Sequence, residues 1–255
     1  MKNLKKVLAF VLVMMLVFCF VGCDSEEDAL TVNEGKLTMA TNAYFQPYEY
    51  YEGEKIIGID AEIAAAIAEK LGLELVIEDM EFSSIITAVN AKSVDFGMAG
   101  MTVTEDRLKE VDFSTSYANG VQSVIVKEGS AITKVDDLFA EGATYKAGVQ
   151  LGTTGDIYAS DDLGKERVTQ YTTGNEAVNA LLGGSIDCVI IDNAPAKAFV
   201  ENNEGLKILD TSYADEDYAI CFAKDNTVLK DKVNKAIAEL TEDGTIDAII
   251  AKYIK

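Results

Sequence analysis

The stretch VDFGMAGMTVTEDRLKEV, residues 94–111, sets the pattern of the whole chain. Its first part, VDFGMAG, is an apolar run that predicts a buried strand. Its second part, TEDRLKEV, predicts a short helix with Thr104 as the N-cap and Arg107 in the first turn. Arg107 is one of only two arginines in a chain of net charge −21. Because a planar guanidinium suits bidentate capture of a carboxylate, the segment predicts an anion-binding residue just beyond a strand.

The residues before this stretch alternate between strand and helix. KLTMAT (36–41) and LELVIED (73–79) predict strands, and SSIITAVNAK (83–92) predicts a helix. Between the two strands, one helical face carries Ile63, Ala64, Ile67, Ala68 and Leu71. A β-α-β-α-β order favours an α/β fold with a largely parallel sheet, whose ligands lie beyond the carboxyl ends of the strands.

The alternation starts again after SYANGVQSVIV (116–126), which predicts a long extended connection. The later strands are expected at TYKAGVQLG (144–152), RVTQYT (167–172), IDCVIID (186–192), LKIL (206–209) and DYAICFA (217–223). The later helices are expected at DDLFA (136–140), TTGDIYAS (153–160), NEAVNALLGG (175–184), APAKAFVENN (194–203) and as a pair within the last 30 residues. Two successive α/β runs predict two domains with a cleft between them.

The N-terminus is typical of an export leader. Three lysines precede an unbroken apolar run, residues 7–22. The residues Phe20, Val21, Gly22 and Cys23 resemble a bacterial lipobox, although Phe20 stands where leucine is usual. We therefore expect a signal peptide at 1–22, a lipidated (palmitate-bearing) Cys23 and an acidic linker at 23–35, which place the globular part outside the cytoplasm. An uncleaved membrane anchor is the alternative.

Composition excludes several classes of function. Removing the leader takes away three lysines and no acids, so 19 basic residues face 43 acidic ones, a net charge of −24. Nucleic acid is therefore a poor partner. The absence of histidine removes imidazole-based triads and zinc sites. Cys188 and Cys221 lie in apolar runs and are expected to be core residues rather than a disulfide.

Together, the ordered motifs resemble the family 3 extracellular solute-binding proteins of amino-acid ABC importers. The resemblance runs from about residue 36 to the C-terminus. It is carried by FQPYEY (45–50), GID (58–60), Phe82, AGMTVTEDR (99–107), VDFS (111–114) with Tyr117, GTTG (152–155) and Asp192.

The resemblance implies a two-lobe fold of the type II periplasmic-binding-protein class. Domain 1 would comprise residues 36–117 and 220–255, and domain 2 residues 118–219. Two crossing strands, near 117–121 and 216–220, would form the hinge, and a ligand bound between the lobes would close them.

The expected site follows from the two charges of an amino acid, both of which a dry cleft must meet. Arg107 would bind the carboxylate, helped by amide groups near Gly100 and Thr102 and by the Thr102 hydroxyl. The helix start at Thr153 and Thr154 would add donors from the second domain, and Asp192 would accept from the ammonium. Asp192 could instead cap the following helix.

The side chain of the ligand would lie between aromatic rings, and its identity is less constrained. The resemblance implies that Phe45 and Phe82 sandwich it, with Tyr44, Tyr48 and Tyr117 as weaker candidates. Asn42 stands where relatives that bind basic side chains often carry a carboxylate, and Gln150 also offers a neutral amide. Both residues favour a neutral polar amino acid. An inward-pointing Glu49 would weaken that preference.

Two other functions remain open at this point. Relatives with this fold include periplasmic dehydratases, so an enzyme that uses carboxylate acid-base chemistry is an alternative. A structural or adhesive lipoprotein, which would bind no small ligand saturably, is another. The favoured expectation is a monomeric binding protein without cofactor or metal, whose partners are an amino acid, an ABC transporter permease and, through the lipid, a membrane.

Overall fold

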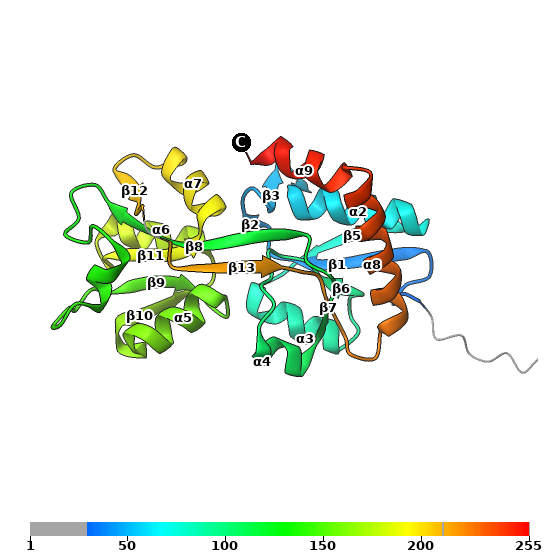
Figure 1. Cartoon of the computed structure of the whole chain (residues 1–255), viewed down its shortest axis with the longest axis horizontal. Helices are drawn as coiled ribbons and strands as arrows, with labels where there is room; N and C mark the ends of the chain where they lie inside the picture. Colours follow the sequence, from blue (N-terminus) through cyan, green and yellow to red (C-terminus); the bar gives the residue numbers. More distant parts are fainter. Residues whose placement is uncertain (1–29, 211, 255) are drawn as a thin grey trace, which may run out of the picture. The chain divides into compact units, whose positions relative to one another are not determined.

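The computed structural model describes residues 30–210 and 212–254. The expected leader, Cys23 and the first part of the acidic linker lie outside these residues. Residues 31–255 form one compact unit, and within it the secondary structure gathers around two separate sheets. We call the elements around the first sheet lobe 1 and those around the second sheet lobe 2 (Figure 1).

Lobe 1 is built on a five-stranded sheet in the order β5-β1-β6-β14-β7. Its strands are β1 (Lys36–Thr41), β5 (Glu74–Asp79), β6 (Phe96–Gly97), β7 (Asp112–Phe113) and β14 (Cys221–Phe222). β1 pairs in parallel with β5 and β6, whereas β14 is antiparallel to β6 and β7. The sheet is therefore mixed, and its antiparallel strand comes from the C-terminal part of the chain.

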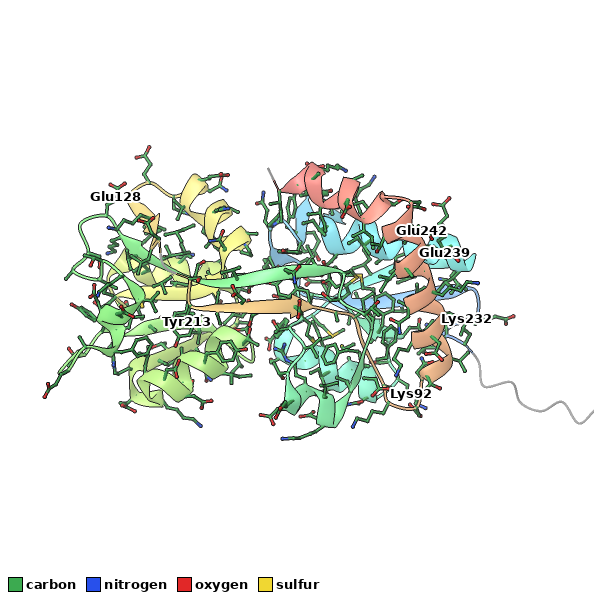
Figure 2. All side chains as sticks on the ribbon, viewed as in Figure 1. Lys92, Glu128, Tyr213, Lys232, Glu239 and Glu242 are labelled. Carbon is green, nitrogen blue, oxygen red and sulfur yellow. The ribbon has the colours of Figure 1, made fainter. Side chains whose placement is uncertain are left out.

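The helices of lobe 1 follow the sequence periodicity. They are α2 (Ile59–Leu71), α3 (Ile85–Asn90), α4 (Glu105–Glu110), α8 (Thr227–Glu242) and α9 (Thr245–Tyr253), with a short 3-10 turn at Phe82–Ser84. α8 buries Leu229, Val233 and Leu240 against the lobe. Other positions of the helix carry exposed charged side chains such as Glu239 and Glu242 (Figure 2). The helix is therefore amphipathic, as the spacing predicts.

Lobe 2 is built on a six-stranded sheet in the order β10-β9-β11-β8-β12, with β13 also paired to β8. Its strands are β8 (Ala118–Lys127), β9 (Ala147–Gln150), β10 (Val168–Tyr171), β11 (Cys188–Asp192), β12 (Leu206–Ile208) and β13 (Ala214–Tyr218). Its helices are α5 (Thr154–Leu163), α6 (Gly174–Gly183) and α7 (Asn193–Asn202), with 3-10 turns at Val135–Phe139 and Lys165–Arg167. The expected helix at 136–140 is thus a 3-10 turn.

Two antiparallel strands connect the lobes. The segment predicted as an extended connection forms β8, which pairs with β11, β12 and β13 inside the second sheet. β8 and β13 run side by side between the two sheets in Figure 1, and Ala118 pairs with Tyr218 at the lobe 1 end. The chain therefore crosses between the lobes on paired strands, which can bend together when the lobes move.

Each lobe contains its own cluster of buried apolar side chains. Lobe 2 packs side chains including Val124, Val149 and Ile190, and lobe 1 packs side chains including Ile85, Val94 and Met101. Cys188 and Cys221 are both buried with free thiols, one in each of these two clusters. The prediction of two core cysteines without a disulfide is confirmed.

Lobe 1 also contains a small three-stranded antiparallel sheet. It comprises β2 (Tyr44–Phe45), β3 (Glu49–Glu52) and β4 (Lys55–Ile57) and was not anticipated from the sequence. The start of α2 is bonded to it, since the Asp60 amide donates to the Tyr48 carbonyl at 2.9 Å. Gly58 makes this junction possible, because its φ is 127° and a Cβ there would lie 2.2 Å from the Tyr48 carbonyl oxygen.

Replacing Gly58 by alanine should therefore lower the free energy of unfolding by about 2 kcal/mol or more, because strain and a backbone clash add. Gly53→Ala is the matched control: its φ is also positive, at 64°, but a Cβ there meets nothing within 4 Å. Chemical denaturation of both variants measures the difference. Equal losses would show that the close approach at Tyr48 contributes nothing.

Candidate functional site

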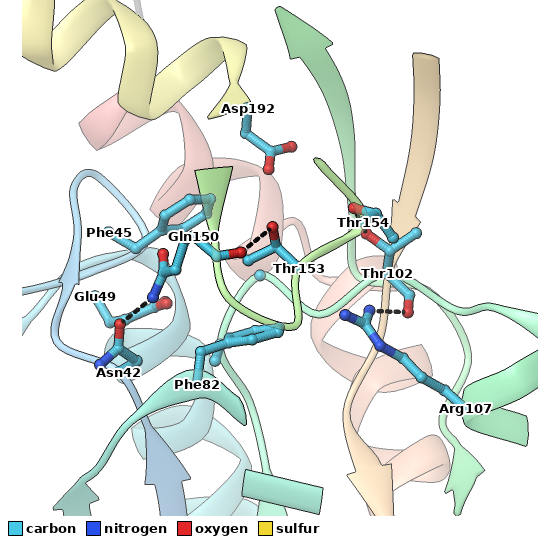
Figure 3. A pocket seen from close by; sticks show the side chains of 12 residues that line it. Asn42, Phe45, Glu49, Phe82, Thr102, Arg107, Gln150, Thr153, Thr154 and Asp192 are labelled. Atoms are coloured by element: carbon cyan, nitrogen blue, oxygen red, sulfur yellow. Dashed lines mark hydrogen bonds between the residues drawn. The ribbon is translucent and has the colours of Figure 1, made fainter. Parts of the chain in front are cut away.

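One pocket lies between the lobes and collects most of the polar residues that the motifs singled out. Figure 3 shows its side chains from close by. The residues that line it are Asn42, Phe45, Glu49, Phe82, Ala99, Gly100, Thr102, Arg107, Gln150, Thr153, Thr154 and Asp192. All ten ligand-binding residues expected from the sequence are among them. The structure therefore brings these residues together, and it adds Glu49 and Ala99.

Arg107 reaches the pocket from the first turn of α4. The Thr104 hydroxyl caps this helix by accepting from the Arg107 amide at 3.2 Å, as the sequence predicts. The guanidinium donates to the Thr102 carbonyl at 2.6 Å and, across the lobes, to the Gly152 carbonyl at 3.0 Å. It also stands over the Phe82 ring, 5.4 Å from its centroid. These contacts hold the Arg107 guanidinium at the boundary of the two lobes.

The Arg107 side chain is buried yet remains a cation. Its exposed fraction is 7%, and burial lowers the pKa of the guanidinium from its ordinary value, an effect that the charge of Glu216 opposes. A guanidinium keeps its proton in proteins even when its pKa falls. These two hydrogen bonds use two of the five N–H donors of the guanidinium, so it can also bind a carboxylate that enters the pocket.

The backbone at Gly100 differs from the expectation. Its amide donates to the Asp60 carboxylate at 2.8 Å, so it is not free to meet a ligand carboxylate. The reason is that Asp60, at the start of α2, lies beneath this loop. Gly100 has a φ of 52°, and a Cβ there would lie 2.8 Å from the Phe45 ring. A glycine therefore lets the loop and the ring approach each other.

Lobe 2 contributes the start of α5. Thr153 is the N-cap of this helix and accepts from the Asp156 amide at 3.3 Å, while its hydroxyl donates to the Gln150 carbonyl at 2.8 Å. The Thr154 hydroxyl lies 3.5 Å from the Thr102 hydroxyl of lobe 1. A helix N-terminus carries free amides and a positive dipole end, which favour an anion beside Arg107.

Asp192 lies at the carboxyl end of β11 and is buried, with an exposed fraction of 6%. Its carboxylate accepts from the Gln122 amide at 2.8 Å and from the Tyr218 hydroxyl. It makes no side-chain capping bond to α7, which removes the alternative role. Burial, together with the charge of Glu216, raises the pKa of Asp192 well above its ordinary value. A cation placed beside it would favour the ionised form.

The aromatic candidates divide into two groups. Phe45 and Phe82 line the pocket, and Phe45 also stacks on Tyr48 at a centroid distance of 5.8 Å. Tyr48 and Tyr117 are buried but do not line the pocket, and Tyr44 is 48% exposed. The three tyrosines that the sequence ranked lower therefore lie outside the pocket lining.

Polar groups occupy the end of the pocket near β1 and β9. The Gln150 amide donates across the lobes to the Asn42 side-chain oxygen at 2.9 Å, and the Asn42 amide donates to the Met80 carbonyl at 2.8 Å. Glu49 also faces the pocket and is fully buried. This inward carboxyl group counts against the preference for a neutral ligand, which stays a prediction.

The lobes are close together in this structure. The cavity between these side chains measures ≈20 Å³, which is about the space that one water molecule needs and too little for an amino acid. Contacts such as those of Arg107 with Gly152 and of Asn42 with Gln150 join the lobes directly. A ligand larger than water can therefore enter only if the lobes separate and these contacts break.

Three supporting residues were not assigned a role from the sequence. Gln122, on β8, donates to Asp192 and also to Glu216 at 3.0 Å, and Asp60 holds the Gly100 loop. A buried polar residue in β8, next to Ser123 and between Val121 and Val124, was the available sign of Gln122. Glu216 gave no such sign, because its contact depends on the pairing of β13 with β8.

Neither a metal site nor a membrane span is found in the part of the chain that the structure describes. No group of acidic, cysteine or histidine side chains there could hold a metal ion. None of the helices within residues 30–210 and 212–254 combines the length and apolar character needed to cross a bilayer.

Comparison with known proteins gives concordant results. The arginine-binding extracellular protein ArtP of Bacillus subtilis (strain 168) is 34% identical over 98% of this chain and 98% of its own length. Among solved structures, an ancestral arginine-binding protein bound to glutamine is 37% identical, with a TM-score of 0.81 over 87% of this chain and 99% of that one. The arginine-, lysine-, histidine-binding protein ArtJ of Geobacillus stearothermophilus is 32% identical, with a TM-score of 0.81 over 86% and 95%.

These structural neighbours confirm the two-lobe fold of type II periplasmic binding proteins. The family match extends over residues 37–255, nearly all of the chain beyond the expected leader and linker. The family is one of binding proteins rather than enzymes, which supports the prediction of a binding protein over the dehydratase alternative. The chain belongs to the bacterial extracellular solute-binding proteins, family 3.

Proposed function

We propose that the protein binds an α-amino acid between its lobes and delivers it to an ABC importer. The observation that carries this proposal is the presence of two buried, oppositely charged groups on one pocket, Arg107 from lobe 1 and Asp192 from lobe 2. A free α-amino acid carries a carboxylate and an ammonium a few ångströms apart. Each needs a partner of opposite charge when it leaves water.

The amino acid that the pocket supports best has a long side chain ending in N–H donors, and arginine is the first candidate. Glu49 supplies a buried carboxyl group, and Phe45 and Phe82 offer apolar faces for a flat guanidinium. The similarity to arginine-binding proteins agrees with this choice. A neutral amide such as glutamine is the second candidate, supported by the Asn42–Gln150 pair and by the related protein bound to glutamine.

Binding and closure are coupled through groups that reach across the cleft. Arg107 contacts Gly152, and Thr102 lies beside Thr154, so each lobe supplies part of the carboxylate site. A ligand carboxylate bound between the lobes would accept hydrogen bonds from both of them, and so would bridge groups that contact each other directly in this structure. The proposed ligand thus has more partners in the closed form than in the open one, which is the condition for shifting the population toward closure.

We also propose the setting in which the protein works. A lipid on Cys23 would tether a monomer to the outer face of the cell membrane by the acidic linker, within reach of the permease. The apolar run and lipobox-like residues support this proposal, and so does the extracellular character of the family.

A thermal-shift series with the twenty amino acids and L-citrulline tests the proposal. Ligand at about 100 times its dissociation constant stabilises a protein by about 2.7 kcal/mol, which should raise the melting temperature by roughly 5 to 10 °C for a chain of this size. We expect arginine to give the largest shift. The absence of a shift with any amino acid would contradict the proposal, and conversion of the ligand, detected by mass, would favour an enzyme.

A further inference from the structure

We infer that Glu49 and Asp60 form one adjustable counter-charge behind the pocket, which keeps a shared proton when the ligand side chain is neutral and releases it to solvent when the side chain is cationic. This inference rests on the proposed amino-acid ligand and deepens it. It makes Glu49 the residue that determines specificity and Asp60 a positioning residue that acts through it.

Glu49 is the member of the pair that faces the ligand. It lies on β3 and lines the pocket, yet its exposed fraction is 0%. Neither of its carboxyl oxygens has a hydrogen-bond donor. Among the described residues, no lysine or arginine forms an ion pair with it. An ionised carboxylate in this position would be uncompensated, which is costly in a buried site.

Asp60 lies at the start of α2 and is also fully buried. One of its oxygens accepts from the Gly100 amide and from the Tyr117 hydroxyl, both at 2.8 Å. Its other oxygen has no donor. The Asp60 amide donates to the carbonyl of Tyr48, the residue before Glu49, at 2.9 Å, so the backbone holds the two acidic residues side by side. A hydrogen bond between their carboxyl groups requires that one of them carries a proton. A shared proton therefore satisfies oxygens that otherwise have no partner.

The surroundings of the pair are predominantly acidic. The titratable groups that face it are Asp79 at the end of β5, Asp192 at the end of β11, Tyr48 before β3 and Tyr117 before β8. The cation on the same pocket, Arg107, donates to the carbonyls of Thr102 and Gly152. Burial, and then the charge of Asp60, raise the pKa of Glu49 well above its ordinary value, and burial raises the pKa of Asp60 to about 6.

A cationic side chain changes this balance. A guanidinium beside Glu49 stabilises the ionised carboxylate and so lowers its pKa in the complex. The O–H bond of the shared proton breaks, the proton passes to water or buffer, and the positive charge of the ligand takes its place. A neutral side chain gives no such stabilisation, so the proton stays. The same pocket can thus bind either a neutral or a cationic side chain, and its selectivity between them depends on pH.

The sign of the pH dependence follows from linkage. A ligand whose binding releases a proton binds more tightly as pH rises, by about tenfold per pH unit for each proton released. The effect operates below the raised pKa of the empty pair and above its lowered pKa in the complex. Arginine should therefore lose affinity as pH falls below the raised pKa of Glu49, while a neutral ligand should not.

Arginine and citrulline provide the test, because they have the same head group and nearly the same shape but differ in the charge of the side chain. Isothermal titration calorimetry in buffers of different ionisation enthalpy counts the protons released by each. Any proton lost from Asp192 on meeting the ammonium is common to both ligands and cancels. We expect arginine to release more protons than citrulline, by up to one, at pH values below the raised pKa of Glu49, and its affinity to rise relative to citrulline as pH increases.

Glu49→Gln should abolish the excess proton release and reduce the preference for arginine, whereas Glu52→Gln, an exposed change on the same strand, should leave both. Equal proton release by the two ligands in the unmodified protein would overturn the inference and leave the proposed function standing. Excess release that persists in Glu49→Gln would overturn the assignment to Glu49. Failure of arginine to bind at any pH would overturn both this inference and arginine as the ligand.

Discussion

Replacing Arg107 by alanine is expected to lower the affinity for the amino acid by roughly 2 to 5 kcal/mol, the range for truncating one partner of a buried charge pair. The carboxylate of the ligand would lose its cation in a site that excludes water. The Thr102 and Gly152 carbonyls would also lose their donor, and with it one direct link between the lobes. Calorimetry with the tightest-binding amino acid measures the loss.

The other arginine provides the matched control. Arg167 donates to the Tyr145 carbonyl at 3.0 Å and to the Leu138 carbonyl at 2.9 Å, both within lobe 2 and away from the pocket. Arg167→Ala should therefore reduce stability without changing affinity. Arg107→Lys should recover only part of the affinity, because an ammonium cannot form the bidentate pair. Unchanged affinity in Arg107→Ala would remove this residue from the site.

Replacing Asp192 by asparagine is expected to reduce affinity by a similar amount, but only for ligands with an α-amino group. Asparagine keeps the shape and can still bond to Gln122 and Tyr218, so the variant removes the charge while retaining much of the packing. An analogue of the amino acid that lacks the α-amino group already lacks the ammonium. The affinity of this analogue, which is already weaker, should therefore be nearly the same in the variant as in the unmodified protein.

This comparison separates an electrostatic role from a structural one. Asp215→Asn, an exposed change on β13, should leave the affinity for both ligands as it is. If Asp192→Asn weakens the amino acid and its deaminated analogue equally, the ammonium assignment is wrong. Asp192 would then act by holding Gln122 and Tyr218 in place.

Local chemistry is what the sequence predicted well. The Thr104 cap and the apolar faces of α2 and α8 depend on residues a few positions apart. Their periodicity and capping patterns act within one element, so they can be read without knowing the neighbours. The order of strands and helices followed from the same patterns.

Long-range pairing is what the sequence left undetermined. The hairpin β2–β4, the antiparallel place of β14 and the pairing of β13 with β8 join segments whose partners no local pattern identifies. The partners of Gln122 and Asp60 depend on these pairings. Glu49 shows the same limit, since only the packing of the hairpin against α2 turns this residue inward, and that orientation changes which ligand the pocket favours.

The central claim is that the two lobes close on an amino acid held by Arg107 at one end and Asp192 at the other. A crystal structure of the complex with the tightest-binding amino acid tests it most directly. We predict the ligand carboxylate within hydrogen-bond distance of the Arg107 guanidinium and the start of α5, and the ammonium against the Asp192 carboxylate. A ligand bound elsewhere, with both of these side chains free of it, would contradict the account.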